Sequence, residues 1–276
     1  MLFVAGFLVL FLFLWLLLFI IAPPIKRLLP RAAHWTTKFR YRDYLPVFLV
    51  LAAGIGAAAM AGDAFLDIAE EVHANTPRLR QIDAETHAWA RTTHTLGATA
   101  FFTTLTLIGT PVGLGILVLL SAALLAMKGR WRWIAYLVIT TGIGGLLNLQ
   151  LKAFFARARP EVAEALRSAH GYSFPSGHAM GAAITFGALA YLALRVLPRW
   201  RWRSAALAFA CAMIVAIAAS RVYLGVHWIS DVGAGIAAGL IWVTAATVAY
   251  ETFRRIRMVR ALRRRRPSDG PNSGQD

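Results

Sequence analysis

The sequence consists largely of stretches without acidic or basic side chains that are close in length to a membrane-spanning helix. Roughly 20 apolar residues in an α-helix cross the hydrocarbon core of a bilayer. Hydrophobic residues make up 58% of the chain and charged residues only 15%, which is more apolar surface than a soluble core absorbs. We therefore expect an all-α, polytopic membrane protein. The predicted spans cover residues 2–22, 44–62, 92–127, 133–151, 168–194, 204–220 and 232–250.

The basic residues concentrate in every second connection between these spans and after the last one. The positive-inside rule predicts this pattern for cytoplasmic segments, so the connections 63–91, 152–177 and 221–231 should share the outer surface. The net charge of +16 would also suit a nucleic-acid-binding protein. Because membrane orientation already explains the charge, we expect the lipid bilayer and no nucleic acid as partner. The basic residues concerned are Lys26, Arg27, Arg31, Lys38, Arg40, Arg42, Lys128, Arg130, Arg132, Arg195, Arg199, Arg201, Arg203 and the arginines from Arg254 to Arg266.

The two ends of the chain are expected to lie outside the main membrane domain. Stretch 2–22 lacks the basic n-region and small-residue cleavage site of a secretory signal, which favours an uncleaved anchor over a cleaved leader. We divide the chain into an anchor with its basic cytoplasmic connection (1–43), a membrane-embedded domain (44–255) and a basic, disordered cytoplasmic tail (256–276). Cys211 is the single cysteine, so the chain has no intrachain disulfide.

Segment 63–91 differs from the other connections because it is rich in acidic residues. It is long enough to form surface helices, with Ile82 and Trp89 at the level of the lipid headgroups. A solvated connection that is anchored by one tryptophan is the alternative. His73, His87 and His94 lie in or beside this segment, but their spacing does not indicate a metal site.

Ionisable side chains follow the apolar stretches in both later outward connections. Lys152, Arg157 and Arg159 follow the predicted span 133–151, and His178 lies within the next one, 168–194. Single charges at span ends are commonly anchors at the membrane surface. Here cations and histidines from separate connections should meet on one membrane face, which indicates a shared site. The last of these connections adds Arg221, His227 and Asp231.

Local spacing suggests how such a site would work. Ser176 and Gly177 stand at a predicted helix start, where backbone N–H groups bind anions, and His178 lies in the first turn. His227 and Asp231 are four residues apart, so on a helix the carboxylate could hold one ring nitrogen and present the other. An ordinary ion pair at a helix start is the alternative.

Several cations, helix N–H groups and two histidines without a metal cage suit a phosphate ester or diphosphate. Phosphoryl transfer requires neutralised equatorial oxygens, an in-line nucleophile and a proton for the leaving oxygen. Lys152, Arg159 and Arg221 would supply the first, His227 the second and His178 the third.

The residues of this expected site form three motifs that follow one another along the sequence. The first is Lys152, six residues, Arg159 and Pro160; the second is Pro175-Ser176-Gly177-His178; the third is Ser220-Arg221, five residues, His227, three residues and Asp231. With these motifs the chain resembles the type 2 phosphatidic acid phosphatase superfamily, integral membrane lipid phosphatases that share their site with vanadium-dependent haloperoxidases. The resemblance implies a six-helix core over residues 44–250, to which span 2–22 is an addition.

The resemblance also implies a role for each motif residue. His227 would be the nucleophile that forms a phosphohistidine, with Asp231 orienting it. His178 would protonate the leaving group and later activate water. No metal or other cofactor would be required, and Arg157, outside the motifs, would touch a second phosphate or face water. The residues expected to hold the phosphate oxygens are Lys152, Arg159, Ser176, Gly177 and Arg221.

The expected function is hydrolysis of a lipid phosphate monoester or diphosphate at the outer membrane face. Lipid tails that stay between helices need not be extracted into water, at a cost of about 0.8 kcal/mol per CH₂. Phosphatidic acid, phosphatidylglycerophosphate and undecaprenyl diphosphate all fit, and the sequence predicts no particular oligomeric state. The alternatives are a lipid phosphotransferase with the same phosphohistidine, a haloperoxidase, which such an apolar chain matches poorly, and a non-enzymatic lipid transporter. Compact connections without a eukaryotic sorting signal favour a bacterial inner membrane.

Overall fold

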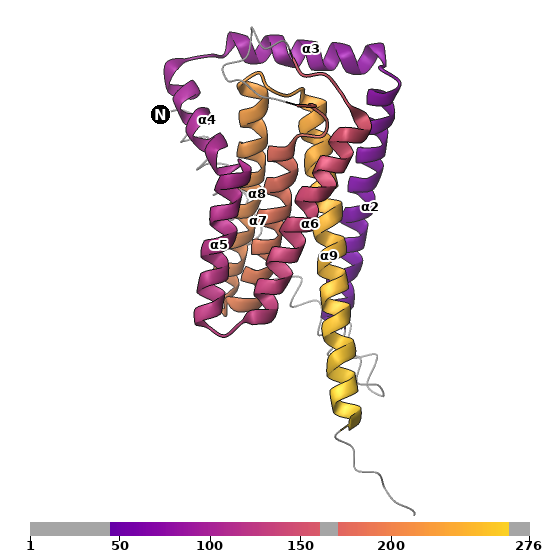
Figure 1. The fold of residues 1–276 in the computed structure, drawn as a ribbon, viewed down its shortest axis with the longest axis vertical. Coiled ribbons are helices and arrows are strands. Elements are labelled where there is room, and N and C mark those ends of the chain that lie inside the picture. Colours follow the sequence, from indigo (N-terminus) through magenta and orange to yellow (C-terminus); the bar gives the residue numbers. More distant parts are fainter. Residues whose placement is uncertain (1–44, 161–170, 265–276) are drawn as a thin grey trace, which may run out of the picture.

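The computed structural model describes residues 45–160 and 171–264; the side chains of residues 45–55, 57 and 258–264 lie outside that description. Its regular structure is entirely helical in the described residues, which confirms the predicted all-α class. The helices pack into one bundle, with α3 lying across one end (Figure 1). They are α2 (Leu45–His73), α3 (Pro77–Thr92), α4 (Leu96–Ile108), α5 (Pro111–Met127), α6 (Trp131–Phe155), α7 (Gly177–Val196), α8 (Trp200–Tyr223) and α9 (Ile229–Arg264).

Most of the predicted spans correspond to helices of the bundle. In the described part of the chain, α6, α7, α8 and α9 up to Arg257 are each long and apolar enough to cross a membrane, and α4 with α5 forms a broken fifth span. Helix α2 contains the predicted span 44–62 except for its first residue. These helices make up the expected six-helix core. The predicted span 2–22 lies outside the described residues.

The predicted span 92–127 is not one continuous helix, because it bends by 55° between α4 and α5. The side chain of Thr110 accepts a hydrogen bond from the Gly113 backbone N–H and thereby caps α5. Pro111 occupies the first turn of α5, where its missing N–H is tolerated, and it disfavours helical backbone at the preceding residue. Similarly, the described part of the predicted span 168–194, residues 171–194, becomes helical only from Gly177.

The acidic segment folds partly as a surface helix, as expected. Thr76 caps α3 by accepting a hydrogen bond from the Leu79 backbone N–H. Leu79 and Asp83 belong to the buried face of α3, whereas Ile82 and Trp89 are 43% and 66% exposed. Their depth at the membrane surface stays a prediction. At the other end of the bundle, α9 continues to Arg264 past the expected domain boundary at 255 and projects beyond its neighbours (Figure 1).

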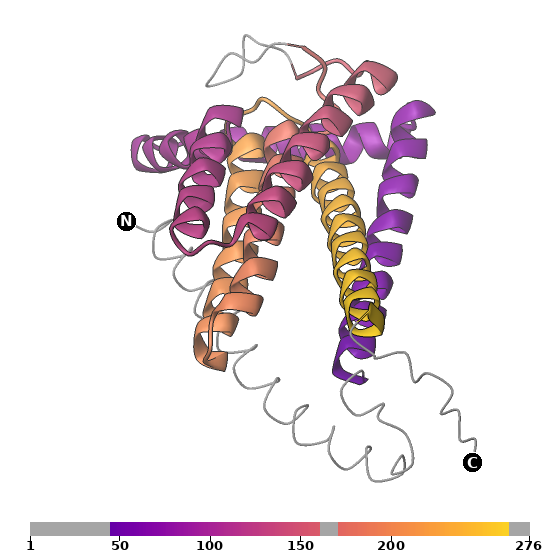
Figure 2. The ribbon, with the colours of Figure 1, turned by 60° about the horizontal axis from the view of Figure 1, so that its bottom comes forward.

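The centre of the bundle is α7, which packs closely against α9. Figure 2, which looks at the bundle from another side, shows the helices converging toward the end where α7 and α9 begin. Gly235 and Gly239 of α9 form a G-x-x-x-G pair, a spacing that lets two membrane helices approach closely. A Cβ atom on Gly239 would lie 2.6 Å from Ala183 Cβ and 2.8 Å from Met180 O. The contact therefore fixes the start of α7 against α9.

We predict that Gly239→Ala destabilises the protein by about 1–3 kcal/mol, because the added methyl group must push two backbones apart. Gly62→Ala on α2 is the control: a Cβ there meets nothing within 4 Å, and replacing a helical glycine should stabilise the protein by about 0.5–1 kcal/mol. Thermal unfolding in detergent measures both effects. Equal unfolding temperatures for the two variants would contradict this account of the α7–α9 contact.

Candidate active site

The three connections predicted to share one surface do meet at the end of the bundle covered by α3. A cavity of about 970 Å³ opens there and extends along α5, α6 and α7. Most of the predicted site residues line it, while Asp231 is fully buried and touches the site through His227. The predicted residues that line the cavity are Lys152, Arg159, Gly177, His178, Arg221 and His227.

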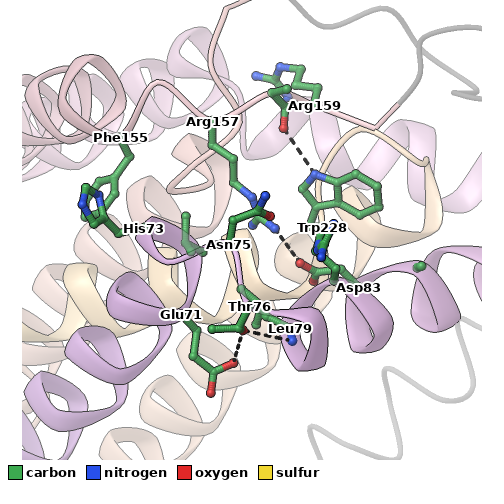
Figure 3. A pocket seen from close by; sticks show the side chains of 14 residues that line it. Glu71, His73, Asn75, Thr76, Leu79, Asp83, Phe155, Arg157, Arg159 and Trp228 are labelled. Carbon is green, nitrogen blue, oxygen red and sulfur yellow. Dashed lines mark hydrogen bonds and ion pairs between the residues drawn. The ribbon is translucent and has the colours of Figure 1, made fainter.

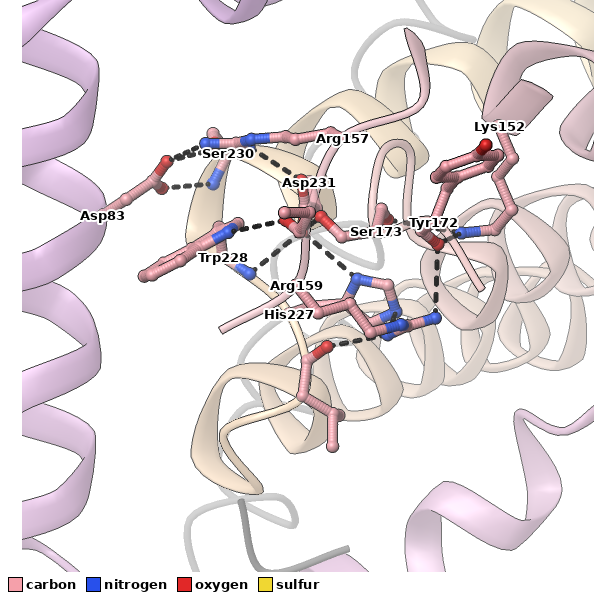
Figure 4. A network of polar contacts seen from close by, with 12 residues as sticks. Asp83, Lys152, Arg157, Arg159, Tyr172, Ser173, His227, Trp228, Ser230 and Asp231 are labelled. Atoms are coloured by element: carbon pink, nitrogen blue, oxygen red, sulfur yellow. Dashed lines mark hydrogen bonds and ion pairs between the residues drawn. The ribbon is translucent and has the colours of Figure 1, made fainter. Parts of the chain in front are cut away.

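His227 lies in the turn between α8 and α9 and is only 2% exposed. Its Nδ1 lies 3.2 Å from Asp231 Oδ2, and Arg159 Nη1 lies 3.1 Å from its Nε2 (Figure 4). A guanidinium group can only donate, so Nε2 is the acceptor and the ring proton belongs on Nδ1, where it donates to the carboxylate. This tautomer presents the Nε2 lone pair to the cavity side of the ring.

Burial also controls the charge of this ring. It lowers the pKa of His227 to about 4, although the Asp231 carboxylate acts in the opposite direction. The imidazole is therefore neutral near pH 7, and its Nε2 lone pair is available to an electrophile.

The buried Asp231 carboxylate accepts several hydrogen bonds. Besides the His227 contact, its Oδ2 accepts hydrogen bonds from Ser173 Oγ at 2.8 Å and from the Trp228 backbone N–H at 3.0 Å. Its Oδ1 accepts one from Arg157 Nη1 at 2.7 Å. These donors compensate the cost of burying the charge and fix the carboxylate plane.

Lys152 and Arg159 are held by backbone carbonyl groups. Lys152 Nζ, in the last turn of α6, donates to Tyr172 O at 2.7 Å. Arg159 donates to Gly171 O at 2.9 Å and to Val226 O at 2.7 Å. Two cations are thus fixed at the cavity rim beside His227.

Arg221 reaches the cavity from the last turn of α8 and is 6% exposed. Its Nη1 donates to Thr106 Oγ1 of α4 at 2.7 Å. Thr106, fully buried and four residues before the α4–α5 break, therefore anchors the third cation. The sequence analysis missed this residue, since nothing in an apolar helix marks one threonine among several.

The start of α7 differs in detail from the expectation. The Ser176 backbone N–H donates to Asp231 O at 2.9 Å, so it is not available to an anion as the sequence suggested. The side-chain atoms Ser176 Oγ and His178 Nε2 are buried and have no hydrogen-bond partner within the described residues. Buried polar atoms without partners are rare. The His178 residue itself lines the cavity.

Arg157 was expected to touch a second phosphate or to face water; in the structure it is only 16% exposed and forms two ion pairs. Its guanidinium group bridges Asp231 and Asp83, with 2.6 Å between Nη2 and Asp83 Oδ2 (Figure 4). Asp83 comes from α3 and was not predicted as a site residue. Its only sequence signal is its position on the same α3 face as Leu79 and His87. Among the described residues, no three His, Cys, Asp or Glu side chains are grouped to hold a metal ion.

Comparison with known proteins identifies the family of this chain. The sequence model of the PAP2 superfamily matches residues 133–255. Phosphatidylglycerophosphatase B of Bacillus subtilis is 30% identical over 203 residues, which cover 72% of this chain and 91% of that protein. Lipid A 1-phosphatase of Rhizobium johnstonii is 39% identical over 126 residues, 42% of this chain and 47% of that protein.

A solved structure is similar as well. The crystal structure described as the first transmembrane PAP2 type phosphatidylglycerolphosphate phosphatase from Bacillus subtilis aligns with a TM-score of 0.65 and 27% identity, covering 71% of this chain and 96% of that one. The expected fold, membrane location and phosphatase class are thereby confirmed. This chain belongs to the PAP2 superfamily of membrane phosphatases.

Proposed function

We propose that the protein hydrolyses the phosphate or diphosphate ester of a membrane lipid through a phosphohistidine on His227. One observation carries the proposal: a neutral imidazole, oriented by Asp231, shares a cavity with three fixed cations and with His178. Hydrolysis of lipid phosphates is also the activity that the names of the relatives describe.

In the first step the phosphate oxygens bind Lys152, Arg159 and Arg221, and the Arg159 guanidinium turns from His227 Nε2 onto an oxygen. Nε2 attacks phosphorus while the ester P–O bond breaks, and protonated His178 gives its proton to the departing oxygen. Asp231 stabilises the positive charge that develops on the ring. Ser176 Oγ and the Gly177 backbone N–H bind the remaining phosphate oxygens.

In the second step water releases the phosphoryl group. His178, now neutral, takes a proton from water while the water oxygen attacks phosphorus. The P–N bond to His227 breaks, inorganic phosphate forms, and both histidines return to their initial states. Besides the substrate, only water and residues of this chain take part in these two steps, so the proposed cycle uses no metal or other cofactor.

The shape of the cavity supports a lipid substrate. On α6 it is lined from Lys152 back to Thr141, a distance of roughly 16 Å at 1.5 Å per residue. That length is about half of the hydrocarbon core. Beyond the cations its walls are apolar and include Leu114, Val118 and Ile184. Phosphatidylglycerophosphate is the substrate that the longest relative match favours, and phosphatidic acid and undecaprenyl diphosphate have the same chemistry.

The charge distribution supports an orientation. Lys128, Arg130 and Arg199 lie in the connections at the end of the bundle opposite the site, and the arginines of α9 continue beyond it. By the positive-inside rule, the site then faces the periplasm or exterior of a bacterial inner membrane and the C-terminus is cytoplasmic. We also propose residues 44–255 as the phosphatase domain, with 1–43 as its anchor and 256–276 as its basic tail.

We predict that His227→Ala abolishes phosphate release from lipid phosphates while the protein stays folded. His178→Ala should lower the rate by about 10²–10⁴ for lipid alcohols, which need a proton to leave, and far less for an aryl phosphate. His73→Ala, an exposed histidine of α2, is the control. Released phosphate measures the rates. Full activity of His227→Ala, or equal losses for both substrate types in His178→Ala, would refute the assigned roles.

We predict that Thr106→Val weakens inhibition by vanadate, a phosphate analogue, roughly tenfold. Valine has the same shape but removes the hydrogen bond that anchors Arg221, and bonds to charged groups contribute about 1.5–3 kcal/mol. Thr104→Val is the matched control, because the Thr104 hydroxyl donates only to Ala100 O of its own helix. Unchanged inhibition in Thr106→Val would show that Arg221 does not need this anchor.

A further inference from the structure

A second apolar groove lies between α6 and α9 at the end of the bundle opposite the candidate active site. Its volume is about 480 Å³, and Arg132 lines it near the start of α6. Arg132 and Lys152 are 20 residues apart on this helix, which corresponds to about 30 Å, the thickness of the hydrocarbon core. The groove and the active-site cavity therefore face opposite leaflets.

Polar groups at the inner end of the groove already have hydrogen-bond partners within the protein. Trp242 Nε1 donates to Thr140 O at 2.7 Å, and Tyr136 and Thr247 share a hydrogen bond of 2.7 Å between their hydroxyl groups. Apart from Tyr250 and the arginines, the side chains that remain available to a ligand are apolar. Ile139, Ile143 and Phe253 line the groove and are 57%, 42% and 60% exposed. Such a surface suits a hydrocarbon chain.

Arginines line the same groove at its outer end. Arg254 is neutralised by Glu251, with Nη2 and Oε2 2.7 Å apart. Arg132 and Arg257 also line the groove, and neither forms an ion pair with a carboxylate of the described residues. Arg257 instead lies 5.6 Å over the Phe253 ring. An apolar groove that ends at two uncompensated guanidinium groups is complementary to an amphiphile with an anionic head.

We propose that this groove binds one anionic phospholipid of the leaflet opposite the active site. An acyl chain lies between α6 and α9, and the phosphate lies between Arg132 and Arg257. The site is distinct from the catalytic cavity, because the two share no lining residue.

The test is native mass spectrometry of the full-length protein in neutral detergent with equal amounts of phosphatidylglycerol and phosphatidylcholine. The wild type should retain one phosphatidylglycerol that Arg132→Gln/Arg257→Gln binds about tenfold or more weakly, since each arginine attracts an anionic lipid by about 1 kcal/mol. Ala246→Phe, which fills the groove but keeps both arginines, should lose it too.

Arg199→Gln/Arg201→Gln is the control, because it removes the same charge from exposed arginines that do not line the groove. We expect it to bind phosphatidylglycerol within twofold of the wild type. Equal losses of phosphatidylglycerol binding in both double variants would contradict the proposal, because they would show that only the total positive charge attracts the lipid. A dimer in place of a bound lipid, or no preference for the anionic lipid, would also overturn the proposal.

An independent observation concerns the Asp83–Arg157 pair beside the active site. Arg157 is 16% exposed and Asp83 only 2%. Asp83 also accepts hydrogen bonds from Ser230, from the backbone N–H at 3.1 Å and from the hydroxyl at 2.7 Å (Figure 4). Helix α3 thereby contacts the start of α9 twice. Asp83 binds Ser230 directly, and it reaches the Asp231 carboxylate through Arg157.

The backbone explains why Arg157 and Arg159 act differently. Helix α6 ends at Phe155, and the following residue, Ala156, adopts the left-handed conformation with φ of 46°. Side chains two residues apart in a helix-free segment need not share a direction, and here they diverge. Arg157 lines only a pocket of about 580 Å³ beneath α3, whereas Arg159 lines both this pocket and the 970 Å³ cavity (Figure 3).

We infer that Asp83 and Arg157 are positioning residues for the reaction, an inference that rests on the proposed function. Arg157 holds Oδ1 of Asp231, which leaves Oδ2 directed at His227 Nδ1. Asp83 fixes the other side of the guanidinium group. Loss of the pair should therefore disturb the orientation of His227 and leave the phosphate-binding cations in place.

The test measures kcat, KM and vanadate inhibition for Asp83→Asn, Arg157→Gln and the double variant. We expect kcat to fall about 10- to 100-fold, with KM and vanadate inhibition within about twofold, as for second-layer partners of other sites. The double variant should be no slower than the slower single variant, because both residues act through one contact. Arg157→Lys should recover part of kcat.

Arg80→Gln, an exposed change on α3, is the control. Weaker vanadate inhibition in Arg157→Gln would place Arg157 on the phosphate instead. If the losses of kcat are additive in the double variant and parallel a fall in unfolding temperature, the pair has only a structural role. A wild type that releases no phosphate from any lipid phosphate would contradict the proposed function, whereas vanadate binding would still report on the site.

Discussion

The site depends on one buried carboxylate. Asp231 is fully buried near the end of an apolar bundle, where an uncompensated charge would cost several kcal/mol. Its oxygens are satisfied by donors from two separate connections: Arg157 and Ser173 between α6 and α7, and His227 and the Trp228 backbone N–H between α8 and α9. Because the buried carboxylate needs these donors, its hydrogen bonds hold the connections against one another. The same contacts orient the histidine that would accept the phosphoryl group.

Helix packing places this carboxylate correctly. The glycines of α9 let it approach the first turns of α7, where Ser176 and His178 stand. The Ser176 backbone N–H then donates to the Asp231 carbonyl oxygen, so one helix contact positions both the proposed general acid and the proposed nucleophile. Small residues in the centre of the bundle thus control geometry at its end. This connection between packing and chemistry explains why a membrane phosphatase can build its site at helix ends.

The sequence predicted much of this arrangement, and the failures have physical reasons. Charge alternation and apolar length predicted the shared surface, and motif spacing predicted which residues line the cavity. The bend at Thr110 was missed because a Thr-Pro pair in an apolar run is a weak signal beside the overall hydrophobicity. The ion pair of Arg157 with Asp83 was missed because the two residues lie 74 positions apart, and such long-range pairing depends on how α3 crosses the bundle. Likewise, the use of the Ser176 N–H by Asp231 follows from tertiary packing alone.

The central claim is that Nε2 of His227 accepts the phosphoryl group. It is tested most directly by quenching turnover of a lipid phosphate in alkali, where phosphohistidine survives, and locating the phosphate by peptide mass spectrometry. The account predicts phosphate on the peptide that contains His227, with more of it in His178→Ala when an aryl phosphate is the substrate. Rapid turnover with no phosphorylated His227, or with phosphate on another residue, would contradict it.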